Sequence, residues 1–506
     1  DLVHICVFKF WDKCSDGVYT AGFDVPLGGW LIQLYDEDGN LVDFGYTNRD
    51  GRLCFVVDKA GTYTVKEEDR AGWSHIEPKS GSWTIYVVSG DEVPLEFANY
   101  EDVKIPIFKY EDRNCNGIYD QGDTPVSGWY FELVRTGDGW TFSGVTDGNG
   151  MLTITVNRSG IYRLTEEARP DWTPVNPASG KVLITLTSGT SVPMQMFGNF
   201  HNVLIPVFKF SDADGDGYYS QAAGDSPLEG WHFYLWKEVS PGHWELVNSN
   251  VTDVNGHTEF IVKDCGRYRI TEESREGWFV ISPNGGQYTF RVCSGKVFEI
   301  PFCFANFKLG TITVYKFDDL NGNGIRDQGE PGLPGWTIEI LSQGTFFWYQ
   351  WGTTGADGSC VFTGLPPGWF TVWEDGQAGW VPTSPSSVSV LVMGNTHAQV
   401  YFLNFQKGCI DGYKYNDVNG NGIYDPGVDT PIQGWTITLA ITTGPIGDPP
   451  ISAIAIIAET LTDENGHYEF CNLGPGIYVV YEEQRQPWVP MTPTSEQVVM
   501  TSGGDI

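Results

Sequence analysis

Basic residues are scarce in this 506-residue chain. Lysine and arginine together number 30, against 64 aspartates and glutamates, which gives a formal net charge of −34. A chain this acidic repels phosphate backbones and anionic lipids, which argues against nucleic acid and anionic membrane surfaces as partners. The same charge attracts cations, and copies of the chain repel one another unless cations screen them.

Long apolar runs and catalytic motifs are also missing. No run of apolar residues is long enough to span a membrane. The ten cysteines form no Cys-x-x-Cys pair, which argues against zinc sites. The eight histidines do not share a repeat position, and neither a nucleophile–base motif nor a phosphate loop is present. We therefore expect no turnover of an external substrate.

A sustained 3.6-residue period is absent as well, whereas turn-forming and aromatic residues are abundant. The chain holds 62 glycines and 29 prolines without a triplet repeat, and 14% of its residues are aromatic. Only 19% of the residues are charged. This composition argues against disorder and suits an all-β protein rich in turns.

One pattern recurs five times, at intervals of about 100 residues. Each copy contains a strand with an in-phase lysine, an acidic Gly-rich loop, a Thr-x-x-x-Gly turn, an aromatic-x-aliphatic-x-Glu strand and a second tryptophan. The pattern predicts an all-β rod of five tandem Ig-like β-sandwich domains, at residues 1–100, 101–200, 201–307, 308–405 and 406–506. The landmark lysines are Lys9, Lys109, Lys209, Lys316 and Lys414.

Four copies close with a Phe-x-Asn sequence. The connection from each closing asparagine to the next landmark lysine is short and has the same length every time. So short a connection leaves no flexible linker, which predicts a stiff rod; the alternative is that tandem duplication merely preserved the spacing. The closing asparagines are Asn99, Asn199, Asn306 and Asn404.

The lysine, glutamate and asparagine of each copy are polar residues in phase with apolar ones. Burying a lone charge costs several kcal/mol, so these groups have to be paired or neutralised. Burial lowers the pKa of a lysine and raises that of a glutamate. A neutral amine is a nucleophile, a carboxamide is an electrophile, and a protonated glutamate can relay protons between them. Their product is a Lys–Asn isopeptide bond with loss of ammonia; the alternative is a buried ion pair hydrogen-bonded to asparagine.

Three short sequences carry a family resemblance. Ile312-Thr-Val-Tyr-Lys-Phe-Asp, Tyr63-Thr-Val-Lys-Glu and the closing Phe-x-Asn resemble the collagen-adhesin B-type (prealbumin-like) domains of surface adhesins and pilins. The acidic loop and its Gly-Trp resemble the calcium-binding B repeats of serine-aspartate-repeat adhesins. In that family the first-strand lysine joins the last-strand asparagine, and an acidic residue catalyses the reaction. The resemblance implies the triads Lys9–Glu67–Asn99, Lys109–Glu166–Asn199, Lys209–Glu272–Asn306 and Lys316–Glu374–Asn404, whereas Lys414 and Glu482 have no asparagine partner in this sequence.

The acidic loops of the second and fourth copies have the spacing of an EF-hand loop placed between strands. Oxygen-bearing residues stand at positions 1, 3, 5, 9 and 12, with glycine at position 6. Hard oxygen ligands and a sharp glycine turn suit Ca²⁺, and the alternative is an Asx-rich turn that needs no metal. The expected ligands are Asp112, Asn114, Asn116, Asp120 and Asp123 in the second copy and Asp319, Asn321, Asn323, Asp327 and Glu330 in the fourth.

The other three loops depart from this spacing. The first copy has only Asp12, Asp16 and Asp24, with Cys14 at position three, so weak or no Ca²⁺ binding is expected there. Because each loop follows its lysine strand directly, a bound cation is expected to stiffen the domain junction. The expected ligands are Asp212, Asp214, Asp216 and Ser220 in the third copy, with Asp225 two residues late, and Asp417, Asn419, Asn421 and Asp425 in the fifth, with Asp429 one residue late.

Six of the cysteines are candidates for disulfides. Cys6–Cys54 and Cys409–Cys471 are plausible strand-to-strand bridges, and Cys293 and Cys303 flank a predicted hairpin. The sequence alone does not fix the connectivity, and small buried thiols are the alternative for each pair.

Three further features allow more than one interpretation. The aromatic run at residues 346–351 is either a carbohydrate-binding platform or a packing surface. The apolar insert at residues 451–457 is either a lateral contact with another subunit or a hairpin packed on its own domain. The fifth copy stops at Ile506, before a Phe-x-Asn sequence. The chain is therefore cut from a longer array, has a last strand that is not included, or receives that strand from a neighbouring subunit.

These features together predict a non-enzymatic extracellular structural protein. We expect a cell-surface stalk, pilus or filament subunit, stiffened by Ca²⁺ loops and by intramolecular isopeptide bonds. The alternative is a surface adhesin array that binds a ligand or a carbohydrate. The expected partners are copies of the chain joined end to end, or a host or matrix ligand.

Overall fold

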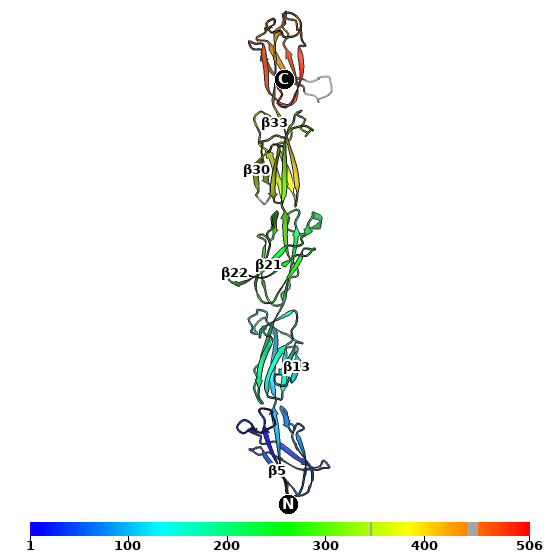
Figure 1. The fold of residues 1–506 in the computed structure, drawn as a ribbon, viewed down its shortest axis with the longest axis vertical. Helices are drawn as coiled ribbons and strands as arrows, with labels where there is room; N and C mark the ends of the chain where they lie inside the picture. Colours follow the sequence, from blue (N-terminus) through cyan, green and yellow to red (C-terminus); the bar gives the residue numbers. More distant parts are fainter. Residues whose placement is uncertain (345–346, 443–453) are drawn as a thin grey trace.

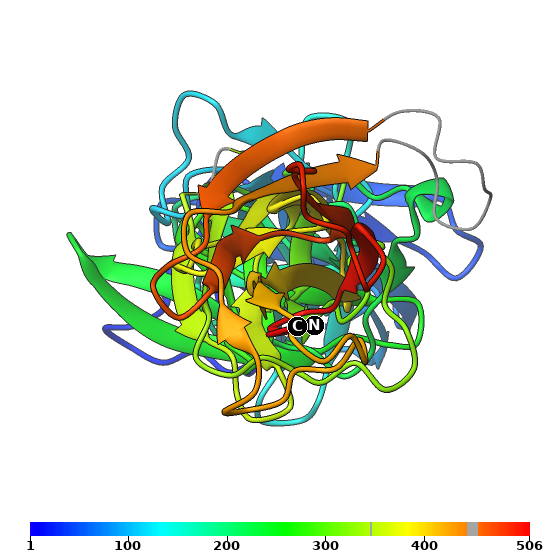
Figure 2. The ribbon, with the colours of Figure 1, turned by 90° about the horizontal axis from the view of Figure 1, so that it is seen from above.

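The computed structural model describes residues 1–344, 347–442 and 454–506. Within these residues the chain is built from strands, with one short 3₁₀ turn, η1 (Gln221–Ala223), and no helix among them is long and apolar enough to cross a membrane. The sandwiches follow one another along a single axis, with the N-terminus at one tip and the C-terminus within the last sandwich (Figure 1). Along that axis the termini nearly superimpose (Figure 2), so the rod is almost straight. The predicted all-β rod of five sandwiches is confirmed.

The first sandwich shows the arrangement that the next three repeat. In one sheet, the lysine-bearing strand β1 pairs in parallel with the closing strand β9 on one edge and antiparallel with β2 and β5 on the other. The second sheet has the order β4-β3-β6-β8 and carries the glutamate-bearing strand β6. The strands are β1 (Val3–Trp11), β2 (Val25–Pro26), β3 (Leu31–Tyr35), β4 (Leu41–Tyr46), β5 (Arg52–Val57), β6 (Gly61–Glu67), β7 (Trp73–Glu77), β8 (Ser82–Val87) and β9 (Glu92–Glu101).

The next three sandwiches have the same two sheets. The second contains β10 (Val103–Glu111), β11 (Thr124–Pro125), β12 (Tyr130–Arg135), β13 (Thr141–Val145), β14 (Met151–Val156), β15 (Gly160–Glu166), β16 (Trp172–Asn176), β17 (Lys181–Leu186) and β18 (Gln195–His201). The third contains β19 (Val203–Ser211), β20 (Ser226–Pro227), β21 (His232–Ser240), β22 (His243–Val251), β23 (His257–Val262), β24 (Gly266–Glu272), β25 (Trp278–Ser282), β26 (Gln287–Val292) and β27 (Phe302–Lys308). The fourth contains β28 (Gly310–Asp318), β29 (Thr337–Ser342), β30 (Tyr349–Thr353), β31 (Ser359–Leu365), β32 (Gly368–Glu374), β33 (Trp380–Pro382), β34 (Ser387–Val392) and β35 (His397–Gln406).

In the described part of the chain, the fifth sandwich lacks a full parallel partner for its first strand, which ends directly before Lys414. Its first strand, β36, pairs with β41, and the backbone beyond β43 forms one parallel bridge, between Cys409 and Asp505. The second sheet has the usual order, β40-β39-β42-β43. The strands are β36 (Gly408–Tyr413), β37 (Tyr415–Asn416), β38 (Thr430–Pro431), β39 (Thr436–Thr442), β40 (Ile454–Leu461), β41 (His467–Leu473), β42 (Gly476–Glu482) and β43 (Ser495–Met500).

Alternation along each first strand builds the core and also places the lysine in it. In β1, Val3, Ile5 and Val7 are buried and pack against Trp30 of the facing sheet. Side chains of a strand alternate between its two faces, so the next inward position is that of Lys9. Lys9 is accordingly fully buried. The apolar pattern that forms the sandwich thus forces an amine into its interior.

The Thr-x-x-x-Gly turn ties the lysine strand to the rest of the domain. Thr47 Oγ1 donates to the carbonyl of Leu27 and accepts from the amide of Trp30, while the amide of Lys9 donates to the carbonyl of Gly51. Gly51 has φ of 72°, and a Cβ there would clash with the carbonyl oxygen of Lys9. Only glycine accommodates both the left-handed backbone and this close approach. The motif therefore recurs because it seats the lysine strand.

Consecutive domains are joined by nearly continuous strands. The closing strand β9 ends at Glu101 and the next first strand, β10, begins at Val103. A single residue likewise separates β18 from β19, β27 from β28 and β35 from β36. So short a connection allows little independent movement of neighbouring domains.

Candidate functional site

Each of the first four domains has a buried lysine paired with a buried glutamate across the sandwich. Lys109, on β10, donates from Nζ to Oε2 of Glu166, on β15 of the facing sheet, at 2.7 Å. Both side chains are almost completely buried. The Nζ–Oε2 distances in the other three pairs are 2.9 Å for Lys9–Glu67, 2.9 Å for Lys209–Glu272 and 2.6 Å for Lys316–Glu374.

The closing strand brings the asparagine to the same place. Lys109 is level with Phe197 on the parallel strand β18, so Asn199, two residues further on, presents its side chain to the same face. All four closing asparagines are buried. In the third domain, Asn306 Nδ2 donates to Glu272 Oε2 at 3.0 Å. The structure therefore gathers the three sequence-predicted residues in each of the four domains.

The buried carbonyl oxygens of these asparagines have no hydrogen-bond partner among the described residues. This holds for Oδ1 of Asn99, Asn199, Asn306 and Asn404. An unpaired buried polar atom normally costs about 1–3 kcal/mol. Four repeats of the same cost at the same atom indicate a chemical reason for it rather than an accident of packing.

Burial shifts the lysine and the glutamate towards their uncharged forms. It lowers the pKa of Lys9, Lys109, Lys209 and Lys316 to about 8, against the attraction of the partner carboxylates. It also raises the pKa of Glu67, Glu166, Glu272 and Glu374. A proton is therefore held more weakly by the amine and more strongly by the carboxyl than in water. Both pKa shifts are in the direction that a nucleophilic amine requires.

The fifth domain presents the same pair in a more open form. Lys414 Nζ lies 2.7 Å from Glu482 Oε2, but these side chains are 20% and 14% exposed. A cavity of about 610 Å³ opens beside them and is also lined by Trp435, Trp488 and Met491. In the other domains the closing strand covers this place.

The acidic loops gather their side chains as the spacing predicts. In the second domain, the side-chain amides of Asn114 and Asn116 both donate to Asp120. The fourth and fifth domains repeat this with Asn321, Asn323 and Asp327 and with Asn419, Asn421 and Asp425. In the first and third domains the ligand atoms of Asp12, Cys14 and Asp16 and of Asp212, Asp214 and Asp216 lie within 4.8 Å of one another. Ser220 contributes its backbone amide to the third loop, where it donates to Asp225.

In the third and fifth loops, the closing acid comes later than position 12 of the EF-hand spacing. It nevertheless has the same role as the acid at position 12 of the second loop. Asp123 accepts hydrogen bonds from the backbone amides of Arg113 and Asp120 and so closes its loop. Asp225 accepts from Ala213 and Ser220, and Asp429 accepts from Val418 and Asp425. The 3₁₀ turn η1 takes up the extra residues in the third domain. Counting positions from the start of the loop did not identify Asp225 and Asp429 as closing acids. The signal that identifies them is a proline two residues after the aspartate.

Each acidic loop except the last lies at the junction with the following domain. The carbonyl of Lys13 accepts from Ser159 Oγ, and the amide of Ser159 donates to Ser15 Oγ. The equivalent positions of the second junction are Cys115 and Cys265, which form a disulfide. In the next two junctions a glycine, Gly215 or Gly322, lies against a proline, Pro367 or Pro475. The same loop position therefore meets the same turn of the next domain four times.

The structure changes the predicted disulfide pattern. Disulfides join Cys6 to Cys54 and Cys409 to Cys471, between paired strands. The predicted Cys293–Cys303 pair does not form, because β26 and β27, which these residues flank, belong to different sheets and make no hairpin. Cys115–Cys265 was not predicted, since its cysteines are 150 residues apart.

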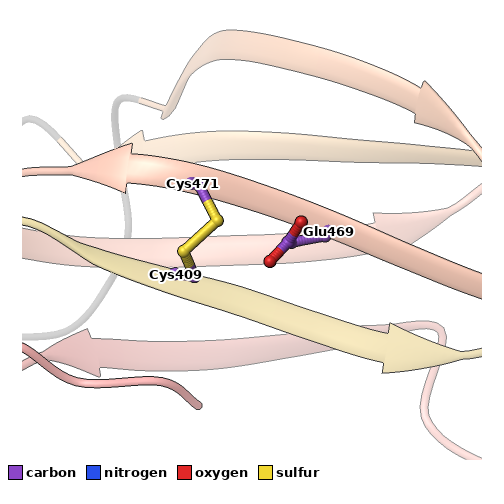
Figure 3. A group of neighbouring side chains, drawn as sticks. All are labelled: Cys409, Glu469 and Cys471. Carbon is purple, nitrogen blue, oxygen red and sulfur yellow. A yellow bond between two sulfur atoms is a disulfide. The ribbon is translucent and has the colours of Figure 1, made fainter.

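One group with metal-type residues is not a metal site. Cys409, Glu469 and Cys471 lie together on β36 and β41 (Figure 3). The two sulfur atoms are bonded to each other, so neither is available as a thiolate ligand.

The aromatic run and the apolar insert fall partly outside the described residues. Phe346 is outside them, Trp348 packs against the fourth core, and Trp351 is 64% exposed on β30. Of the insert, residues 451–453 lie outside the described part, and the following residues form β40, an edge strand paired with β39. Ile456 and Ile457 on this strand are exposed.

Comparison with known proteins identifies the repeat. Residues 310–390 and 409–499 match the SdrD B-like domain. The fourth and fifth domains are therefore similar to B-type repeat domains. Over 76% of its length it is 25% identical to serine-aspartate repeat-containing protein F of Staphylococcus epidermidis. Over 98% of its length it is 23% identical to serine-aspartate repeat-containing protein D of Staphylococcus aureus strain MW2.

The chain spans only part of these relatives, 24% of the first and 39% of the second. The extracellular or cell-surface location predicted from the sequence agrees with these serine-aspartate repeat-containing relatives. Among solved structures, the Bacillus anthracis TIE protein is 15% identical, with 79% of this chain and 75% of that chain covered and a TM-score of 0.28. BcpA, the major pilin subunit of Bacillus cereus, is 14% identical, with 61% and 100% covered and a TM-score of 0.25.

Proposed function

We propose that the chain is a load-bearing rod of the cell surface, in which a Lys–Asn isopeptide bond closes each of the first four domains. The observation that carries this proposal is the fourfold recurrence of a buried Lys–Glu pair beside an asparagine whose Oδ1 has no hydrogen-bond partner in the described part of the chain. A bond between the first and last strands of a sandwich would let tension pass through covalent bonds. Copies of the chain joined end to end and a host or matrix ligand are the partners that fit such a rod.

The side chains of the second domain can carry out the reaction without another reactant. One proton of the Lys109 ammonium group first moves to Glu166. The neutral Nζ of Lys109 then attacks Cγ of Asn199, while the carboxyl group of Glu166 donates a hydrogen bond to the side-chain amide of Asn199. The new Nζ–Cγ bond forms and the Cγ–Nδ2 bond breaks. The proton lost by Nζ passes through Glu166 to Nδ2, which leaves as ammonia. Atoms and charge balance, and the glutamate ends in its initial state.

The acidic loops supply the second element of the proposal, with Ca²⁺ sites above all in the second and fourth domains, whose loops have the full EF-hand spacing. Their donor set of carboxylates and amide oxygens fits a hard divalent cation, and the side chains already converge in the second, fourth and fifth domains. A bound Ca²⁺ would supply positive charge among the clustered carboxylates. Asp319, Asn321, Asn323, Asp327 and Glu330 would hold it in the fourth domain. Because the loops of the second and fourth domains contact the next domain, Ca²⁺ bound in them would hold these junctions more firmly.

Removal of one loop carboxylate is expected to remove one Ca²⁺ from the chain. Asp327→Ala takes away the group on which Asn321 and Asn323 converge, and its exposed neighbour offers the control Gln328→Ala. In titration calorimetry the first variant is expected to bind one Ca²⁺ fewer and the control the same number as wild type. At 100 times the dissociation constant, a site stabilises its domain by about 2.7 kcal/mol, so the variant also melts lower in Ca²⁺. Equal stoichiometry in all three proteins would contradict the site.

Ligand binding is the second candidate function, because one face of the fourth domain presents a row of aromatic side chains. Trp351 and Trp373 stand level with Glu339 on the three neighbouring strands β30, β29 and β32. Aromatic faces beside a carboxylate can bind sugars through stacking and hydrogen bonds. Binding to an array of immobilised glycans that Trp351→Ala abolishes would support this function, and an array without signal would remove it.

A further inference from the structure

The tryptophan that covers each buried lysine also contacts an arginine in the first three domains. In the second domain, Lys109 Nζ lies 4.3 Å from the ring centre of Trp129, and Cζ of Arg169 lies 4.2 Å from the same ring. Lys9 and Arg70 lie 4.7 and 4.0 Å from the ring of Trp30. Lys209 and Arg275 lie 4.6 and 4.3 Å from that of Trp231. In the fifth domain, Lys414 and Arg485 lie 5.1 and 4.9 Å from the ring of Trp435, so two cations on one indole ring recur in four of the five domains.

Hydrogen bonds hold the arginine in this position. Arg169 Nη2 donates to the carbonyl oxygen of Gly128 at 2.6 Å, and its Nε donates to Glu167 at 2.8 Å. The second tryptophan of the repeat, Trp172, packs with its ring edge-on to Trp129 at 5.3 Å. The guanidinium group, the two indole rings and the buried amine therefore form one fixed stack.

The fourth domain contains a neutral version of the same stack. Gln377 stands where the other domains have arginine, and its Nε2 donates to the carbonyl oxygen of Gly335 at 3.3 Å. Lys316 Nζ still lies 4.4 Å from the ring of Trp336, and Trp380 still packs edge-on to that ring. The backbone contact is thus retained while the positive charge is absent.

The charge of the arginine acts on the state of the lysine. A guanidinium group stays protonated at any pH that the protein meets, and a like charge nearby disfavours an ammonium ion. Burial is the main reason that the pKa of Lys109 falls to about 8, and Arg169 lowers it further. The pKa of Lys316 falls to about 8 through burial without such an arginine, so the arginine makes the smaller contribution.

We propose that Arg70, Arg169 and Arg275 are positioning residues for the cross-linking reaction, holding the tryptophan against the lysine and favouring the neutral amine. This proposal rests on the Lys–Asn cross-link proposed above. It predicts that domains with arginine close faster than the fourth domain, where Gln377 lacks the charge. The second and fourth domains can therefore be compared within one chain. One substitution, Arg169→Gln or Gln377→Arg, gives either domain the residue of the other.

The test follows cross-linking domain by domain in the full chain. The chain is made by cell-free translation, samples are quenched in acid at intervals, and reduced digests are analysed by mass spectrometry for cross-linked and free peptides of each domain. Arg169→Gln is expected to slow closure of the second domain roughly fivefold, with the first and third domains unchanged in the same samples. Gln377→Arg is expected to accelerate the fourth domain, and Arg169→Lys to keep most of the wild-type rate because it keeps the charge.

Three results would overturn the proposal in distinguishable ways. Equal rates for wild type and Arg169→Gln, or no acceleration by Gln377→Arg, would remove the role of the arginine but leave the cross-link. An equal loss of rate in Arg169→Lys and Arg169→Gln would show that only packing matters. Free lysine and asparagine peptides from every wild-type domain at all times would overturn the cross-link itself.

Discussion

Replacing Glu166 with alanine is expected to leave the second domain without its cross-link. Among the described residues, Glu166 is the only one whose carboxylate lies against Lys109 Nζ, at 2.7 Å, so the substitution removes the group proposed to relay the proton. Leaving one partner of a buried ion pair alone costs about 3–5 kcal/mol, so the second domain should also unfold at a lower temperature. Peptide mass spectrometry of the reduced, digested chain measures the first effect, and calorimetry measures the second.

The control for this variant is Glu132→Ala. Glu132 lies on β12, next to the strand of Glu166, but its side chain is exposed, so both the cross-link and the melting temperature should be retained. A cross-linked Lys109–Asn199 peptide in the Glu166→Ala protein would contradict the assigned role of the glutamate. The proton relay would then belong to another group.

Under tension, the first four domains of the reduced wild-type chain are expected to release almost no hidden length. Lys109→Met removes the closing bond of the second domain while keeping a side chain of similar size. The segment from residue 109 to residue 199 then becomes extensible, which at about 3.3–3.6 Å per residue gives a step of roughly 300 Å. The protein has to be reduced for this measurement. The Cys115–Cys265 disulfide, which links cysteines 150 residues apart, otherwise keeps most of this segment from extending. Single-molecule pulling from the two termini measures the step.

Lys104→Met provides the matched control for the pulling experiment. Lys104 lies on the same strand, β10, but on its outer face and exposed, so its loss should add no step. If the reduced wild-type chain already released a step of this length for each of its first four domains, those domains would have no closing bond. The load-bearing proposal would then fail, although the fold would stand.

The sequence was sufficient to predict the architecture because one alternation rule serves both the core and the site. A lysine in phase with Val3, Ile5 and Val7 has to point between the sheets, and the structure finds it there. The same rule placed the glutamate on the facing sheet and the asparagine on the closing strand. The bond among these residues stays a prediction, because proximity and protonation favour a reaction without demonstrating its product.

Features that depend on contacts between domains could not be predicted in this way. Cys115 and Cys265 come together only because the acidic loop of one domain meets a turn of the next, and no local pattern encodes that meeting. The predicted disulfide between Cys293 and Cys303 does not form for a related reason, because the chain between them crosses from one sheet to the other. Asp225 and Asp429 were misjudged because a loop can absorb extra residues while its closing carboxylate stays in place.

The intact mass of the denatured, reduced chain tests the central proposal most directly. Four closed domains predict a wild-type mass lower than the sequence mass by four ammonia molecules, since only four domains hold a complete Lys–Glu–Asn set in this chain. The Lys109→Ala protein should lack three ammonia molecules relative to its own sequence. A wild-type mass equal to the sequence mass would contradict the proposal, and the buried triads would then be ion pairs that hold the sandwiches together without a covalent bond.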